Sequence, residues 1–169
     1  MFVVKFNGVF GFIKPYSAVR DELIYSQKFL TPSILNGMEQ KFFPELLKQR
    51  KCSKIIRHKL ASNSISIQQE TTKAKEGTAV SIIKRGILIN PVLYLAFEDI
   101  DDAKNVVRQH ICLCRNEDLM FADSEITEMS KEKFDELKGF EFFEDEENGI
   151  IVGFNRYDNF KPMKVTLAF

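Results

Sequence analysis

The sequence has no stretch that approaches the about 18 uninterrupted apolar residues of a membrane-spanning helix. Its first residues, MFVVKFNG, also lack the basic segment and long apolar run of a signal peptide. These two absences predict a protein that stays in the cytoplasm and has no membrane partner.

Cysteine is scarce, and its three copies form no recognisable framework. An odd number argues against a set of disulfides. Cys112 and Cys114, with His110 nearby, invite a metal site, but the pair is too tightly spaced for a common zinc knuckle and no second pair follows. We therefore expect buried, reduced thiols, no metal and no cofactor.

Sequence motifs of the common enzyme classes are also missing. The chain has no phosphate-binding P-loop, no dinucleotide fingerprint, no nucleophile elbow around a serine and no paired-histidine zinc motif. Clustered acidic residues at 101–102 and 145–147 fall at a predicted helix start and a predicted turn, where we expect them to be solvated. Nothing local therefore supports a nucleotide hydrolase, a dehydrogenase, a serine hydrolase or a zinc protease.

What the chain does have is enough apolar sequence for one globular domain over residues 1–169. Hydrophobic residues make up 44% of it and charged residues 28%. Apolar residues at helical spacing predict helices that begin near residues 31, 99 and 130. Segments rich in Val, Ile and Phe predict strands. The predicted strands are 2–6, 53–60, 80–83, 87–97, 140–144, 150–154 and 165–169.

The order of these elements predicts an α+β fold, a ferredoxin-like sandwich in which helices cover one face of a sheet. Residues 61–86 are polar and have no apolar period, so we predict that they protrude as a hairpin or loop, with Lys84-Arg85-Gly86 separating two strands. Asn148-Gly149 between apolar runs is a strong hairpin signal. Residues 140–169 are therefore predicted to form a C-terminal hairpin and a last strand.

The net charge of zero conceals an uneven distribution along the chain. Residues 1–94 contain 15 Lys and Arg against 6 Asp and Glu, a net charge of +9, and residues 95–169 carry −9. The first half would attract a polyanion. Alternatively, the two halves neutralise each other across the fold.

Basic residues gather in the segment KIIRHK (54–59) and in the loop after the first strand. With alternating side chains, the segment carries cations on both faces of its strand, which suits a strand that borders a polyanion. An ordinary charged edge strand is the alternative. Together with tyrosines of the loop, these cations would form a groove that holds RNA phosphates and stacks bases. The predicted RNA-binding residues are Lys14, Tyr16, Arg20, Tyr25, Lys28, Ser33, Lys54, Arg57, Lys59 and Arg115.

Histidine offers the candidate for catalysis. His58 would act as the general base that activates a 2′-hydroxyl in RNA cleavage, assisted by Tyr25 or Tyr16, with Lys59 stabilising the charge of the phosphorane. The alternative is an exposed histidine without a catalytic role. His110 is predicted to lie on the inner side of a helix, as a core residue.

Two further segments bear on the predicted groove. Thr31 is a suitable N-cap and Pro32 fits the first helical position, so the N–H groups of Ser33 and Ile34 remain for a phosphate. In the segment LCRNED (113–118), Arg115 either binds a phosphate or pairs with a neighbouring acid, Glu117 or Asp118, to brace the loop. Bracing is the simpler interpretation.

The stretch FGFIKPYSAVRDELIYSQKFLTPSILNGMEQKFF resembles the start of the Cas-five family, CRISPR-associated proteins of the RAMP superfamily in type I effector complexes (Cascade). The residues that carry the resemblance are Gly11-Phe12, Ser26, Thr31-Pro32-Ser33 and Gly37. The segment LCRNED is similar to a short family segment after the second helix, and residues 61–86 stand where such proteins carry a thumb-like hairpin. The chain is short for the family and has no glycine-rich loop near its C-terminus.

This resemblance implies a ferredoxin-like fold, binding of the 5′ handle of a guide RNA, and contact with a backbone subunit and a large subunit in antiviral defence. One branch of the family also cleaves precursor RNA. We expect a non-catalytic RNA-binding subunit. The alternatives are a metal-independent endoribonuclease and a structural or protein-interaction factor of a phage or plasmid without a nucleic-acid role.

Overall fold

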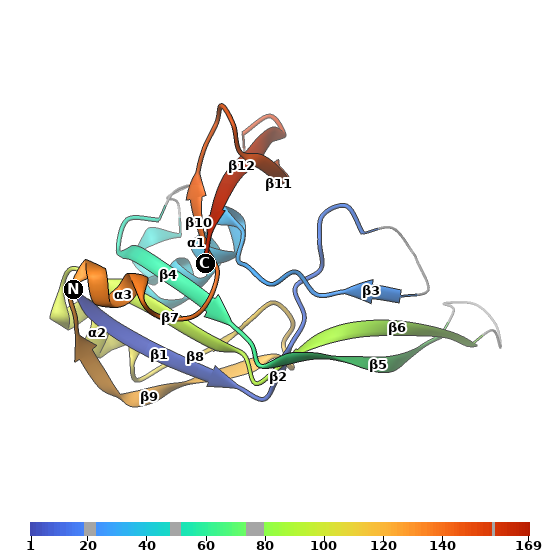
Figure 1. Ribbon diagram of the computed structural model, residues 1–169, viewed down its shortest axis with the longest axis horizontal. Coiled ribbons are helices and arrows are strands. Elements are labelled where there is room, and N and C mark those ends of the chain that lie inside the picture. The colour runs from blue at the N-terminus through green and yellow to red at the C-terminus, as the bar shows by residue number, and fades with distance from the viewer. Residues whose placement is uncertain (19–22, 48–51, 74–79, 157) are drawn as a thin grey trace.

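The computed structural model describes residues 1–18, 23–47, 52–73, 80–156 and 158–169 (Figure 1). The fold is mixed α+β and is built mostly of strands. Within the described ranges, no helix has the length and apolar character needed to cross a membrane.

A five-stranded antiparallel sheet forms the centre of the molecule (Figure 1). Val4 and Phe6 point to one face of the first strand and Val3 and Lys5 to the other, as alternation along a strand requires. The strand order is β4 (Ile55–Ala61), β7 (Val92–Phe97), β1 (Phe2–Gly8), β9 (Leu119–Glu128) and β8 (His110–Cys112).

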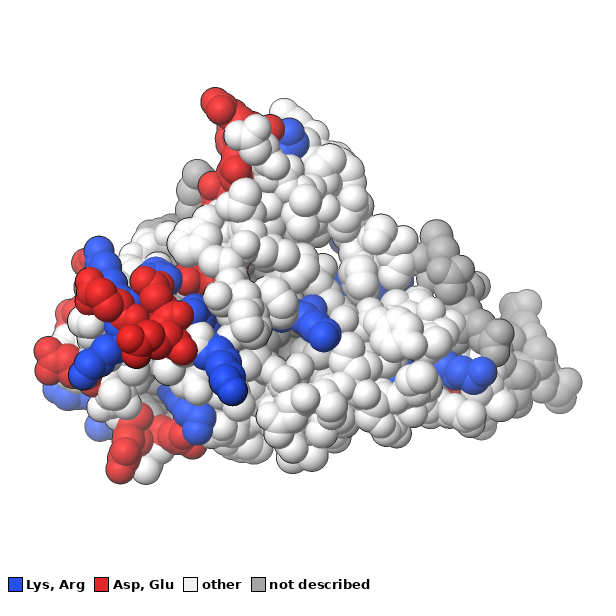
Figure 2. Space-filling view, in the orientation of Figure 1, with Lys and Arg blue, Asp and Glu red and all other residues white. Residues whose placement is uncertain are grey.

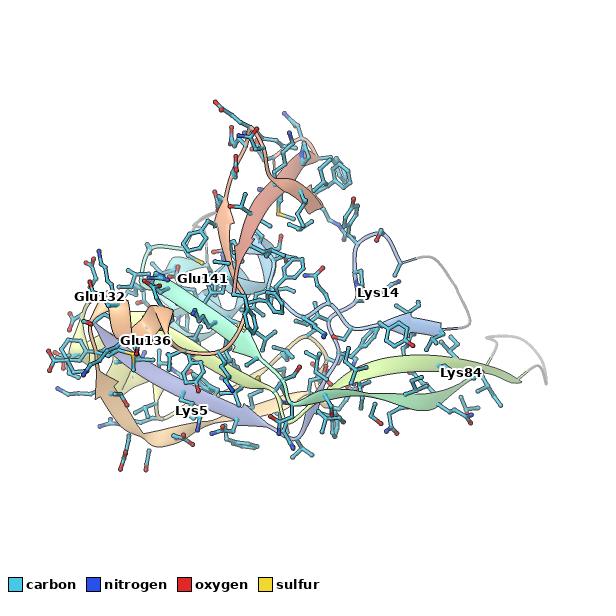
Figure 3. All side chains as sticks on the ribbon, in the orientation of Figure 1. Lys5, Lys14, Lys84, Glu132, Glu136 and Glu141 are labelled. Atoms are coloured by element: carbon cyan, nitrogen blue, oxygen red, sulfur yellow. The ribbon has the colours of Figure 1, made fainter. Side chains whose placement is uncertain are left out.

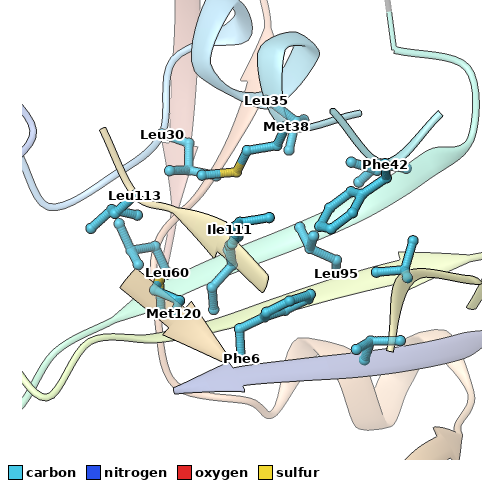
Figure 4. Close-up of a cluster of buried hydrophobic side chains, with 14 of the residues drawn as sticks. Phe6, Leu30, Leu35, Met38, Phe42, Leu60, Leu95, Ile111, Leu113 and Met120 are labelled. Carbon is cyan, nitrogen blue, oxygen red and sulfur yellow. The ribbon is translucent and has the colours of Figure 1, made fainter. Parts of the chain in front are cut away.

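The helices α1 (Pro32–Phe42) and α2 (Ile100–Val106) pack on one face of this sheet. Figure 4 shows Leu35, Met38 and Phe42 of α1 above Phe6 and strand residues of the same core. The predicted N-cap at residue 31 is confirmed, because the Thr31 side chain accepts a hydrogen bond from the N–H of Ile34. A 3₁₀ turn, η1 (Pro44–Leu46), follows α1.

The opposite face of the sheet carries a smaller apolar cluster. Phe134 of α3 (Lys131–Asp135) is fully buried there against Val3 and Ala96. Ser130 caps this helix as predicted. Both faces of the central sheet are therefore covered at the end where α3 lies.

A long hairpin projects from the central sheet (Figure 1). Its strands β5 (Ser64–Lys73) and β6 (Val80–Ile89) lie largely within the segment 61–86 that the sequence predicts to protrude. On its other edge β6 pairs with β2 (Phe10–Gly11) and β3 (Leu23–Tyr25). The predicted break at residues 84–86 is wrong, because these residues pair continuously within β6 and the chain turns at Asn90, with φ of 46°, before Pro91.

The C-terminal residues form a separate three-stranded sheet. β12 (Lys161–Ala168) lies between β10 (Glu141–Glu144) and β11 (Ile150–Asn155) and pairs with both. The predicted direct pairing of 140–144 with 150–154 is therefore wrong. The local Asn-Gly signal specified a turn, but the last strand competes for the same edges.

The second helix is shorter than its pattern predicts. α2 ends at Val106, and His110 lies in β8 with an exposed side chain. The prediction of a core histidine on a helix is therefore wrong. Apolar residues of β8, such as Ile111, continue the helical spacing by coincidence.

Candidate nucleic-acid interface

The strand β4 carries most of the predicted phosphate-binding cations, but it does not alternate regularly. Its register against β7 shifts between Ile55 and Arg57. This bulge places His58 beside Ile55 and Leu60 on the helix-covered face, while Arg57 and Lys59 point to the other face. Strict alternation predicts that His58 shares a face with Lys54 and Ile56, and the bulge makes this prediction wrong.

Arg57 is engaged in an internal ion-pair network. Its Nε and Nη2 atoms donate to the buried carboxylate of Glu141 at 2.6 and 2.5 Å, and Nη2 also donates to Asp135 at 2.7 Å. These hydrogen bonds, first those to Glu141, raise the pKa of Arg57. The guanidinium also lies 4.9 Å from the ring of Phe134. Arg57 therefore links β4 to α3 and β10.

Lys59 and Lys54 are also engaged within the fold. Lys59 is only 3% exposed, and its Nζ donates to the carbonyls of Asp135 and Leu137 at the end of α3, both at 2.7 Å. Lys54 pairs with Asp102 at 2.5 Å and lies 4.2 Å from the ring centre of Phe43. The predicted role of these lysines in phosphate binding has to compete with these contacts.

Glu39 of α1 is a buried residue that the sequence interpretation missed. Its carboxylate accepts hydrogen bonds from the backbone N–H groups of Ser53, Lys54 and Ile55. Its position among the apolar residues of an amphipathic helix was the available signal, because a fully buried acid requires partners. The contact fixes the entry of β4 against α1.

His58 is not exposed, contrary to the premise of the cleavage hypothesis. The side chain is 4% exposed, and its Nε2 accepts a hydrogen bond from the N–H of Phe142 at 3.3 Å. Burial, and then the charge of Arg57, lowers the pKa of His58 to about 3. The lone pair that a general base would use is thus already occupied by the backbone of β10.

Arg115 braces its own loop. Its Nη2 donates to the fully buried Asp118 at 2.7 Å, and Nη1 lies 3.4 Å from Glu117. The hydrogen bond to Asp118 raises the pKa of Arg115. Asp118 also accepts from the N–H of Phe12 at 3.0 Å, so this pair ties the loop to the base of the hairpin.

The start of α1 offers less to a phosphate than its sequence predicts. The N–H of Ile34 already donates to the carbonyl of Thr31 at 3.0 Å and to its hydroxyl at 3.4 Å. The Ser33 hydroxyl donates to the sulfur of Met163 in β12. Of the two predicted donors, the N–H of Ile34 is taken by the cap.

The predicted residues between β2 and α1 are the ones left available. Lys14 and Lys28 are exposed and have no ion-pair or hydrogen-bond partner among the residues that the structure describes. Tyr16 is 53% exposed and meets the ring of Phe154 edge-on at 6.0 Å. Arg20, the remaining cation of this group, lies outside the described residues.

The ring of Tyr25 packs over Gly86 in the sheet of the hairpin. Tyr25 lies opposite Gly86 in the parallel pairing of β3 with β6, and its ring fills the space where a Cβ on that glycine would stand 2.3 Å from Cδ1. The residue as a whole is nevertheless 51% exposed. Lys84, two residues before Gly86, shares this face of β6.

The electrostatic setting of these residues differs from that of β4. Figure 2 shows acidic side chains gathered over α3, where Figure 3 labels Glu132 and Glu136, and at the tip of the C-terminal sheet. Lys14 and Lys84 lie away from both acidic areas, toward the hairpin (Figure 3). Sequence reasoning missed Lys84 and Gly86 because it placed both in a turn.

A cleft of about 760 Å³ separates α1 from the C-terminal sheet. Ser33 and His58 line it together with apolar residues. Its charged lining consists of Glu141, Glu144, Glu146, Asp158, Lys161 and Lys164. Because acids outnumber bases there, the cleft does not suit a polyanion.

The three cysteines are free, but the prediction that they are buried is wrong: Cys114 is exposed, and Cys52 and Cys112 are only partly buried. Within the described ranges, no group of three or more His, Cys, Asp or Glu side chains is arranged to hold a metal ion. Comparison with known proteins adds no identity: no protein-family profile matches the chain. No curated protein matches it either.

Proposed function

We propose that this chain is a non-catalytic RNA-binding subunit of the Cas-five type, which holds the 5′ handle of a guide RNA in a CRISPR effector complex. The proposal rests first on the sequence resemblance around Gly11-Phe12 and Thr31-Pro32-Ser33. Two features of the structure support it: the order of strands in the central sheet, and the surface around Tyr25.

The central sheet supports a ferredoxin-like fold. If the hairpin, the short strands β2, β3 and β8 and the turn η1 are left aside, the chain runs β1-α1-β4-β7-α2-β9, and the sheet order is β4-β7-β1-β9. This order is consistent with a β-α-β-β-α-β unit, and both helices pack on one face of the sheet. The short β8 is an addition at the edge beside β9.

The observation that carries the RNA-binding proposal is the pairing of available cations with exposed rings. Lys14 and Lys28 have no partners in the described chain, and they flank Tyr16 and Tyr25 in sequence. Cations without internal partners hold phosphates, and exposed rings stack unpaired bases. Because the ring of Tyr25 rests on Gly86, it keeps a fixed orientation toward such a base.

The endoribonuclease alternative loses its proposed catalytic group. His58 and Lys59 point to opposite faces of β4, and both are buried and bonded within the fold. Tyr25 belongs to a different sheet, on the hairpin. These three side chains share no surface at which an RNA backbone could meet them.

Fluorescence anisotropy with a labelled single-stranded repeat RNA, in a salt series, tests the proposal. Affinity should fall steeply with salt, and the double variant Lys14→Ala/Lys28→Ala should reduce the slope of log K against log salt by about 1.4, at about 0.7 for each lost phosphate contact. The matched control Lys131→Ala/Lys138→Ala removes two exposed lysines near α3 and should leave the slope unchanged.

Two outcomes would contradict the proposal. One is undetectable or salt-insensitive binding by the unmodified protein. The other is an equal change of slope in both double variants, which would show attraction by net charge alone. Incubating the same RNA with EDTA checks the alternative, because a cut that is lost on His58→Ala would restore the nuclease hypothesis.

A further inference from the structure

The outer edge of the hairpin is an unpaired strand edge. β5 pairs with β6 along residues 64–73, and no other strand of the described chain pairs with it. Its outward N–H and C=O groups therefore face solvent along the whole strand. Figure 1 shows this edge on the side away from β3 and clear of the central sheet.

β5 lacks most of the features by which edge strands usually avoid other strands, although its last residue is Lys73. The strand contains no proline, and its register against β6 is continuous without a bulge. Its one acid, Glu70, pairs with Arg85 of β6 at 3.2 Å. Ile67 is 53% exposed and Ile82, on the same face of the hairpin, is 56% exposed. A long, flat and partly apolar edge is a template for another strand.

We propose that β5 pairs with β5 of a second copy of this chain, antiparallel, about a two-fold axis at Gln69. Antiparallel pairing places residues of the same face opposite each other. Gln69 then lies opposite its own copy, Thr71 opposite Ile67, and Glu70 opposite Gln68. The two hairpins form one continuous sheet across the axis.

A second copy of β5 fits as the partner because of the side chains that this register brings together. On one face, Ile82 pairs with Thr71 inside each hairpin, and Thr71 meets Ile67 of the other copy, so the exposed isoleucines form one row. On the other face, each Glu70 meets the uncharged Gln68. No like charges stand opposite each other, which is the condition for a strand to pair with itself.

The RNA surface of the proposed function and the self-pairing edge use different groups, although Ile67 lies opposite Gly86 on the hairpin face that carries Tyr25. Tyr25 belongs to β3 on the far side of β6, and β5 uses backbone groups that point away from it. Self-pairing is therefore measured on the protein alone, without RNA. Its outcome is independent of whether the chain binds a guide RNA.

A charge-reversal pair tests the register. In Ile67→Lys/Thr71→Lys, two lysine pairs face each other across the axis, whereas in Ile67→Lys/Thr71→Glu the same two contacts join opposite charges. Within one hairpin these positions are four residues apart on one strand, about 13 Å, and do not touch. The dimer of the first variant should dissociate at least about tenfold more readily than that of the second.

Sedimentation equilibrium of the full chain measures the dissociation constant, and the unmodified protein should reach twice its 19.6 kDa monomer mass. The control Ser124→Lys/Thr127→Lys adds two lysines at exposed sites of β9 in the central sheet and should dimerise like the unmodified protein. A monomer at every concentration overturns the proposal. Equal dissociation constants for the two charge variants overturn it as well, because the dimer would then use another surface.

Discussion

The cations of β4 and those between β2 and α1 look alike in sequence, but the structure pairs the first group internally and leaves the second exposed. Arg57 and Lys59 are bonded to groups of α3 and β10, and neither is free to meet a ligand. Lys14 and Lys28 are exposed and without partners in the described chain. The comparison shows that the density of positive charge along the sequence does not tell which cations remain available. The fold decides this, because it pairs some cations with acids and carbonyls and leaves others exposed.

The difference also explains the uneven distribution of charge along the sequence. Lys5, Lys54 and Arg57 in the first half pair with Asp123, Asp102 and Glu141 in the second. Long-range pairing between the two halves therefore uses part of the opposite net charges. The alternative that the halves neutralise each other describes β4 and the central sheet, whereas Lys14 and Lys28 remain outside this pairing.

The largest effect is expected from breaking the β4 network. Arg57→Ala leaves the carboxylate of Glu141, which is 2% exposed, without its cation and should lower the free energy of unfolding by about 4 kcal/mol. Urea denaturation measures it, with Lys28→Ala as a control that should change stability by less than about 0.5 kcal/mol. Similar losses in the two variants would remove the distinction between the two groups of cations.

Arg115 tests whether a cation braces the fold or holds a phosphate. If it braces the loop, Arg115→Ala leaves the buried Asp118 poorly compensated and lowers the free energy of unfolding by about 3 kcal/mol. Urea denaturation and RNA anisotropy on the same preparation separate the roles. An unchanged stability with a lower RNA affinity would move Arg115 into the group that holds phosphates.

The buried imidazole of His58 should make stability depend on pH. Its pKa in the folded state is about 3, below the value of about 6.5 in the unfolded chain, so the unfolded state binds more protons between these values. Stability is therefore lost as pH falls through this window, by about 2 kcal/mol from pH 7 to pH 5.

The variant His58→Gln removes the titrating group and serves as the comparison for this prediction. Urea denaturation at pH 7 and pH 5 measures the free energy of unfolding of both proteins. Between these pH values the unmodified protein should lose about 2 kcal/mol more than the variant. Parallel pH profiles of the two proteins would mean that His58 is accessible to protons in the folded state. That result would also reopen its role as a base.

The smallest expected effect concerns the exposed ring on the hairpin. Tyr25→Ala should weaken binding of a single-stranded RNA about tenfold, since stacking contributes about 1–3 kcal/mol for each base, with little change in stability. Gly86→Ala should weaken binding too, because its Cβ would displace the ring of Tyr25. The control Phe160→Ala removes another exposed ring, and an equal loss there would show that exposure alone decides binding.

Local patterns in the sequence predicted the parts of the fold that depend on neighbours along the chain. The first strand and the Thr31 cap of α1 are confirmed, because alternation and capping involve residues close in sequence. The bulge in β4 and the insertion of β12 between β10 and β11 were missed. Both depend on strands distant in sequence, which a local pattern does not contain.

The candidate site divides in the same way. Tyr16, Tyr25, Lys14 and Lys28 could be named from residue type alone, since rings and cations in a polar loop suit RNA. Lys84 and Gly86 could not, because only the parallel pairing of β3 with β6 brings them beside Tyr25. Their sequence, Lys-Arg-Gly, is as typical of a turn as of a strand interior.

By itself, then, the sequence determined which residues carry charge, which segments extend or coil, and where α1 begins. Only the tertiary structure decided which cations are neutralised, because Glu141 meets Arg57 across 84 positions of the chain. Electrostatic pairing and burial depend on distance in space. For that reason His58 became a core residue, while Lys14 and Tyr25 stayed at the surface.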